Sequence, residues 1–394
     1  MLYAFPWFLT CLGVLVCGYP HVAPEAVELT QLDVGISCAQ YPRTPTVVTF
    51  VVDRPDAAPP LPLLLLLHFD FLKLKSLDTL TVRAVVNGTV GAVVDTFTSA
   101  STAPFFSVPL HATAAVLELH VTGVSSHASP SSGGPCFGFH VDGVRTSAID
   151  DGNRVAADES ICGVDESKNA QCFVSSGMYT ASKAVVRLLT HRHKRSVFCT
   201  GWLLGCDGHV LTNEHCIADA ADAVNTTFEF MAEGVSCSTN CSGQGMCKAA
   251  PRLFTRGATF IIASKDLDYS LVKLSPATIP PGLGFLRLRA SGPKLNEPVY
   301  IPQHPRGWGK RVAVVKGNRT GTITSLTLSG CAVDQAGYML DTQPGSSGSP
   351  VVSAVDNTVV ALHHCGGCPN AGIQSQKILK DLVARGLLPP CSAA

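Results

Sequence analysis

The sequence is poor in charge. Only 15% of its 394 residues are charged, and 29 Lys and Arg balance 29 Asp and Glu, so the formal net charge is zero. A nucleic-acid binder or a protein of anionic membranes needs a basic excess to displace counterions. The balance therefore excludes a dedicated function of either kind.

Long apolar runs are also scarce. The apolar N-terminus, Met1 to Cys17, is short for a membrane span and turns polar after it, and Leu63 to Leu67 is shorter still. Light residues at Val16 and Gly18 fit the cleavage site of a signal peptide, although the usual basic start is missing. We expect residues 1–18 to be a signal peptide, the protein to be secreted, and no stable membrane insertion; a membrane anchor is the alternative.

Cysteine, by contrast, is abundant. Sixteen Cys are present, and removal of Cys11 and Cys17 with the signal peptide leaves 14, an even number. Such density in an exported protein indicates disulfides rather than metal thiolates. The pair Cys365 and Cys368 has zinc-site spacing, but no second pair accompanies it. We therefore expect no metal.

Gly and Pro are plentiful as well, with 35 and 26 residues, and this composition favours a turn-rich β protein. Residues 19–160 contain short runs rich in Val, Leu and Thr, which predict a β-sandwich-like domain, either a pro-segment or an accessory domain. Its Cys38 and Cys136 could close one disulfide. Residues 161–390 contain further short strand-like runs and then a helical pattern with apolar Ile378, Leu379, Leu382 and Val383.

The motif Gly-Ser-Ser-Gly-Ser-Pro at residues 345–350 has the composition of a nucleophile turn. A nucleophilic Ser needs a tight turn that exposes its hydroxyl while backbone N–H groups converge on a developing oxyanion. Glycines on both sides of Ser347 permit such a turn. The oxyanion hole would be formed by the N–H groups of Gly345 and Ser347, although a Gly/Ser-rich turn alone is usually an ordinary loop.

Two further motifs supply a base and a carboxylate. His215 follows a strand-like run and is next to Cys216, and a disulfide from Cys199 to Cys216 would hold the loop that carries it. Asp268 enters another strand-like run and could orient the imidazole; it lies closer to the strand than Asp266. Taken singly, these residues would be an ordinary surface His and a turn-capping Asp.

The three motifs together, in the order His, Asp, Ser, resemble the trypsin/chymotrypsin superfamily. The Gly-Ser-Ser-Gly-Ser-Pro ending resembles the branch of glutamyl and lysyl endopeptidases and secreted proteases of eukaryotic microbes. The resemblance covers roughly residues 162–388. It implies an all-β chymotrypsin-like double β-barrel with a C-terminal helix, and a secreted serine endopeptidase with the triad His215, Asp268 and Ser347. Ser346 stands where pancreatic-type enzymes carry the Asp that pairs with a new N-terminal ammonium.

The resemblance leaves two substrate specificities open. Asp341 lies six residues before Ser347, at the place of the Asp that binds Lys or Arg in trypsin-like enzymes. Thr342 and His364 match the residues with which glutamyl endopeptidases bind Glu. We expect a slight preference for basic residues at P1, because a negative charge near the pocket floor repels Glu.

The expected partners are protein or peptide substrates, and no cofactor is needed, because the covalent mechanism requires only the triad, the oxyanion hole and water. The alternative is an inactive protease homologue that acts as a secreted binding module. A missing triad residue would favour it, and all three are present.

Overall fold

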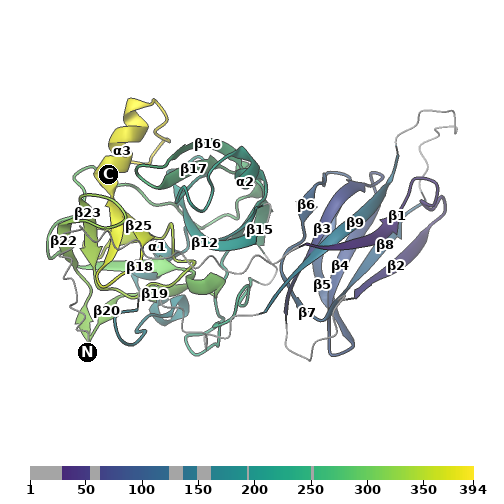
Figure 1. Ribbon diagram of the computed structural model, residues 1–394, viewed down its shortest axis with the longest axis horizontal. Coiled ribbons are helices and arrows are strands. Elements are labelled where there is room, and N and C mark those ends of the chain that lie inside the picture. The colour runs from purple at the N-terminus through teal and green to yellow at the C-terminus, as the bar shows by residue number, and fades with distance from the viewer. Residues whose placement is uncertain (1–28, 54–62, 124–135, 149–160, 193–194, 250–252) are drawn as a thin grey trace, which may run out of the picture.

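The computed structural model describes residues 29–53, 63–123, 136–148, 161–192, 195–249 and 253–394. The expected signal peptide, residues 1–18, lies outside them. Two bodies lie along the long axis of the molecule: an N-terminal β-sandwich, on the right in Figure 1, and a double β-barrel on the left. The all-β prediction is confirmed.

The sandwich consists of two antiparallel sheets. One contains β1 (Thr30–Ile36), β9 (Gly138–Ala148), β3 (Leu63–Lys73) and β6 (Phe105–Phe106), with β7 (Leu110–Ala112) on the far part of β3. The other contains β2 (Thr46–Asp53), β8 (Ala114–Val121), β4 (Thr79–Val86) and β5 (Thr89–Phe97). Alternate apolar residues turn inward, as Leu80 and Val82 of β4 do, both at 0% exposure. A disulfide joins Cys38 and Cys136.

The double barrel consists mainly of two further sheets. The first has the order β15 (Leu253–Arg256), β14 (Thr226–Phe230), β11 (Val185–Arg192), β12 (Arg195–Leu204), β13 (His209–Thr212), β17 (Tyr269–Lys273), β16 (Thr259–Ser264). The second has the order β10 (Lys168–Asn169), β19 (Arg311–Ala313), β18 (Val299–Gln303), β24 (Pro350–Ser353), β25 (Val359–Cys365), β26 (Asn370–Gln374), β23 (Gln335–Tyr338), β22 (Ile323–Leu328). A ribbon of β20 (Val315–Lys316) and β21 (Arg319–Thr320) accompanies it.

Helices are few and short. They are α1 (Gly177–Ser182), α2 (Ala220–Val224), α3 (Ser375–Ala384) and the 3-10 turns η1 (Ala170–Phe173), η2 (Pro276–Thr278) and η3 (Pro305–Gly307). The expected C-terminal helix is α3, whose Ile378 and Leu382 are fully buried. Its Asp381 accepts a 2.5 Å hydrogen bond from the Tyr269 hydroxyl, which ties the helix to the start of β17. None of the helices among the described residues is long and apolar enough to cross a membrane.

The sandwich packs against the first barrel. The ring of Phe106 stacks on that of His191 with centroids 4.3 Å apart, and the Arg145 guanidinium lies 4.7 Å from the Phe106 centroid. Arg256 of the barrel pairs with Asp95, whose side chain is 1% exposed. Burial lowers the pKa of His191 to about 3, so the ring is neutral and packs as an aromatic. The contact therefore combines apolar stacking with a buried ion pair.

The fourteen cysteines outside the first 18 residues form seven disulfides. The pairs are Cys38–Cys136, Cys162–Cys368, Cys172–Cys237, Cys199–Cys216, Cys206–Cys391, Cys241–Cys247 and Cys331–Cys365. Cys365 and Cys368 belong to different bonds, so they form neither a redox pair nor a zinc site.

Candidate active site

His215 and Asp268 meet where two strands of the first barrel end. The pairing of Thr212 with Ser270 places the end of β13 beside the start of β17, so the loops that carry the two residues are neighbours. His215 Nδ1 lies 2.8 Å from Asp268 Oδ2, and the His215 backbone N–H donates to Asp268 Oδ1 at 3.1 Å. The imidazole is 43% exposed and the carboxylate 18%. The ring is thus held on its Nδ1 side and open to solvent.

Asp268 is held in an unusual conformation. Its φ is 39°, in the left-handed region that Asp tolerates better than most residues. The Asn213 side-chain amide donates to its carbonyl at 2.7 Å and fixes the turn. Burial acts to raise the pKa of Asp268, but hydrogen bonds from His215 and His364 outweigh it and hold that pKa below its usual range. The carboxylate therefore stays ionised.

Ser347 lies on the tight turn that its glycines predict. Gly345 has φ 94° and Gly348 φ 86°, which an L side chain rarely adopts. Thr200 of β12 anchors this turn twice: its N–H donates to Ser347 O at 2.9 Å and its hydroxyl to Gly345 O at 2.9 Å. Thr200, which sequence reasoning did not single out, thus connects the nucleophile turn to the first barrel.

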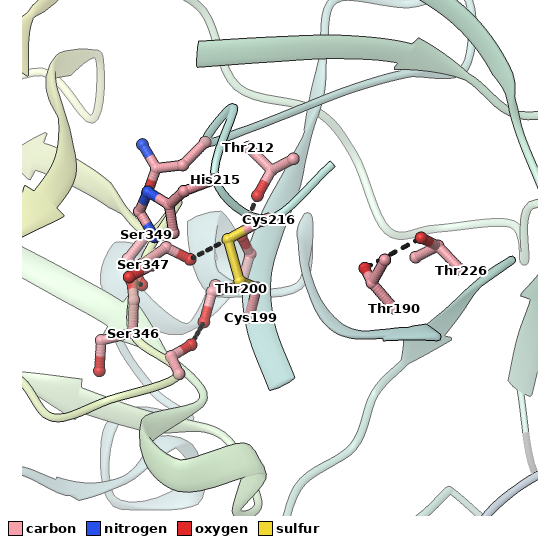
Figure 2. Close-up of a disulfide and its surroundings, with 12 residues drawn as sticks. Thr190, Cys199, Thr200, Thr212, His215, Cys216, Thr226, Ser346, Ser347 and Ser349 are labelled. Atoms are coloured by element: carbon pink, nitrogen blue, oxygen red, sulfur yellow. Dashed lines mark hydrogen bonds between the residues drawn. A yellow bond between two sulfur atoms is a disulfide. The ribbon is translucent and has the colours of Figure 1, made fainter. Parts of the chain in front are cut away.

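The Cys199–Cys216 disulfide connects the base to the same strand (Figure 2). Cys199 lies on β12 next to Thr200, and Cys216 follows His215. Cys216 Sγ is 3.9 Å from Ser347 O, so the loop of His215 and the turn of Ser347 are in contact. The disulfide and Thr200 together bring the three predicted triad residues into one region of the molecule.

Two backbone N–H groups in the turn are available to a ligand. Three others in the turn already have acceptors: Ser346 N donates to Gln343 O, Gly348 N to His363 O, and Ser349 N to Ser346 O. Those of Gly345 and Ser347 donate no hydrogen bond recorded within the described part of the chain. These are the two groups that the sequence assigned to an oxyanion hole.

Ser346 is fully buried and engaged in the turn itself. Its hydroxyl accepts from Gln343 N at 3.1 Å, and the Gln343 side chain bonds both Arg306 Nε and Asp165 Oδ2, at 2.8 and 3.1 Å. The disulfide Cys162–Cys368 fixes the segment that carries Asp165. The segment that carries Asp165 therefore braces the turn through Gln343.

Asp341 is not free to face a substrate. Its side chain is 1% exposed, and Oδ1 lies 2.6 Å from Lys316 Nζ while Oδ2 accepts from Glu166 N at 2.9 Å. The charge on which the expected preference for basic residues rests is therefore neutralised within the protein. Thr342 is likewise buried, and its hydroxyl donates to Asn370 Oδ1 at 3.1 Å.

His364, matched by resemblance to a residue that binds Glu, contacts Asp268. Its Nδ1 lies 3.2 Å from Asp268 Oδ2. His363 has different partners, with Nδ1 2.7 Å from the Tyr338 hydroxyl. Burial lowers the pKa of His363 to about 3, so this ring is neutral. The repeated His in the sequence concealed which ring faces which side. Because the register of β25 shifts between His363 and Cys365, the contacts of the two rings, rather than regular alternation, distinguish them.

One group in the described residues has the spacing of a metal site: Cys199, His215 and Cys216. The two sulfurs are bonded to each other, so neither is a thiolate that could bind a metal.

Comparison with known proteins places this geometry in a family. Residues 199–362 match the family model of the trypsin-like peptidase domain, a range that contains His215, Asp268 and Ser347. The chain is 49% identical over 287 residues to Secreted RxLR effector protein 73 of Plasmopara viticola, and the aligned region covers 72% of this chain and 70% of that protein. It is also 32% identical over 181 residues to the uncharacterized protein y4fB of Sinorhizobium fredii, over 42% of this chain and 25% of that one.

Among solved structures, the HtrA-type protease AlgW with tripeptide is 15% identical, with a TM-score of 0.38, over 52% of this chain and 64% of that one. Deg5 is 15% identical, with a TM-score of 0.37, over 54% and 92%. The match of residues 199–362 to the trypsin-like peptidase domain agrees with the double barrel. The chain belongs to the same family as that effector protein, and its barrels form a trypsin-like peptidase domain of the chymotrypsin-like fold.

Proposed function

We propose that the protein is a secreted serine endopeptidase that acts through His215, Asp268 and Ser347. The observation that carries this proposal is the joint placement of the three: His215 held by Asp268 at 2.8 Å, in a loop whose disulfide touches the Ser347 turn. Secretion is supported by the seven disulfides, which form in oxidising compartments, and by the similarity to the secreted effector protein of Plasmopara viticola.

The proposed mechanism gives each group a defined role. Ser347 Oγ attacks the scissile carbonyl carbon while His215 Nε2 takes the hydroxyl proton. Asp268 accepts the Nδ1–H bond and stabilises the imidazolium that forms. The N–H groups of Gly345 and Ser347 stabilise the oxyanion. His215 then protonates the leaving amine, and water hydrolyses the acyl-enzyme by the reverse proton transfers.

We further propose that this site needs no ammonium trigger. The Ser346 hydroxyl cannot form the ion pair that activates pancreatic-type enzymes. Its position is fixed instead by Gln343, which Asp165 and Arg306 brace from the side. Because Cys162–Cys368 attaches the bracing segment covalently, the turn holds its shape without a newly cut terminus.

Covalent labelling tests the catalytic assignment. A fluorophosphonate probe is expected to attach to Ser347 in the purified protein, because among the described serines this is the one for which we propose a base and an oxyanion hole. Mass spectrometry of the labelled peptide identifies the residue. Ser347→Ala is expected to abolish labelling, and Ser291→Ala, at an exposed serine outside the site, is the control that should retain it. Labelling at another serine, or none in a folded sample, would contradict the proposal.

Failure to label would favour the alternative function, a non-catalytic binding module. The similarity to an effector protein is compatible with such a role. The conformation of Asp268 and its contact with His215 argue for catalysis, because a binding module has no need of a strained Asp held against a histidine.

A peptide-library cleavage profile is expected to show no enrichment of Lys or Arg at P1. The reason is the ion pair between Asp341 and Lys316, 2.6 Å long and almost fully buried. Lys316→Gln is the informative control, because it removes the cation and leaves Asp341 charged. Basic P1 residues should gain only in that variant. A tenfold or greater preference for Lys or Arg in the unmodified protein would refute this interpretation.

A further inference from the structure

His364 makes a contact that the proposed mechanism does not use. Its side chain is 4% exposed, and its Nδ1 lies 3.2 Å from Asp268 Oδ2. His215 Nδ1 approaches the same oxygen at 2.8 Å. Two imidazoles thus share one carboxylate oxygen, although a single imidazole suffices for the triad. The nitrogen of His364 that faces this oxygen must carry a proton, since an ionised carboxylate only accepts hydrogen bonds.

The other ring nitrogen of His364 also faces an acceptor. Nε2 is hydrogen-bonded to Gln335 Oε1, and the Gln335 side-chain NH₂ donates to Ala332 O. Exchanging the amide oxygen and nitrogen would set Gln335 Oε1 against the Ala332 carbonyl, so the network fixes the orientation of the amide. Gln335 is fully buried, so no solvent is there to replace a lost partner. Nε2 must therefore carry a proton as well.

From these two contacts we propose that His364 is held as an imidazolium and is a positioning residue for Asp268. It donates Nδ1–H to the carboxylate and Nε2–H to Gln335. The proposal rests on the proposed catalytic function, because it concerns how Asp268 serves His215. The Cys331–Cys365 disulfide fixes the residue after His364 and the loop that carries Ala332, so the network is braced on both sides.

A fixed cation at this place has a defined effect on the base. Positive charge on His364 opposes positive charge on His215 across the shared carboxylate. The third ring of the cluster, His363, is buried and neutral and adds no charge. Lys265, Asp266 and Lys377 line the cavity beside Ala332, where their opposite charges partly cancel.

The pH dependence of kcat/KM tests this role. His364→Gln retains a side-chain donor for Asp268 but removes the charge. It is expected to move the acid limb of the profile upward by about half a pH unit or more, with the plateau changed less than about fivefold. His364→Ala loses the donor too, and is expected to lower kcat with little change in KM. His120→Gln, on the sandwich, is the control and should leave the profile unchanged. An acid limb that does not move in His364→Gln would overturn the proposal.

A second measurement does not depend on activity. In the Ser347→Ala protein labelled with ¹⁵N-histidine, the His364 resonances, assigned by their loss in His364→Gln, are expected to show both ring nitrogens protonated at neutral pH. A neutral His364 would overturn the proposal even in an active enzyme. A protonated His364 in a protein that Ser347 probes fail to label would support it as a structural fact and refute only the catalytic function.

Discussion

Asp268→Asn is expected to lower kcat by about 10⁴-fold while leaving the fold intact, by analogy with the same change in other enzymes of this fold. The Asn amide would offer an N–H to His215 Nδ1, which then accepts instead of donating. The proton would move to Nε2, the nitrogen that must take the proton of Ser347. The base would thus be present in the wrong tautomer. Single-turnover kinetics on a peptide ester, with circular dichroism as a check on folding, measure the effect.

Asp266→Asn is the matched control for this change. Asp266 lies in the same turn but outside the hydrogen bonds to His215 and His364, and its replacement should alter kcat less than about twofold. If Asp266→Asn impaired catalysis as much as Asp268→Asn, the triad assigned here would be wrong. If neither did, Ser347 would act without an oriented base.

Much of the fold follows from local patterns. The run Thr79 to Val86 alternates apolar and polar residues and forms β4 with the bounds that the pattern indicates. β9 gives no such pattern, because Asp142 and Gly143 interrupt it and His140 bonds Asp70 and Asp33 on the neighbouring strands. Its pairing with β1 and β3 is a property of the sheet, which a local pattern does not contain.

The candidate site, too, is only partly predictable from local patterns. The motifs around His215, Asp268 and Ser347, such as the glycines that flank Ser347, are local features, so the sequence alone is enough to propose the triad. The role of Asp341 depends on its ion pair with Lys316, 25 residues away in the sequence, and no local pattern predicts that pair. Resemblance to a family can therefore predict where a side chain such as that of Asp341 lies, but not which residue it binds.

Gly348→Ala is expected to disable the Ser347 turn at a cost of several kcal/mol of stability. A Cβ at Gly348 would overlap Thr200 O and Thr212 Oγ1 and would lie 3.2 Å from Thr212 Cα, so two of the three contacts are with backbone atoms that cannot rotate away. The φ of 86° adds strain of about 1–3 kcal/mol, and overpacking adds a similar amount. Relief requires Ser347 to move away from β12.

Such a movement breaks the bond from Thr200 N to Ser347 O and misplaces the hydroxyl relative to His215. A displacement of about 1 Å lowers catalysis by on the order of 100-fold, so kcat/KM should fall by at least that factor. Gly330→Ala is the control, since no atom lies within 4 Å of its added Cβ and it should change neither stability nor activity. Thermal unfolding and the rate of probe labelling separate the two effects. Normal labelling in Gly348→Ala would show that the close packing of this turn against Thr200 and Thr212 is dispensable for the nucleophile.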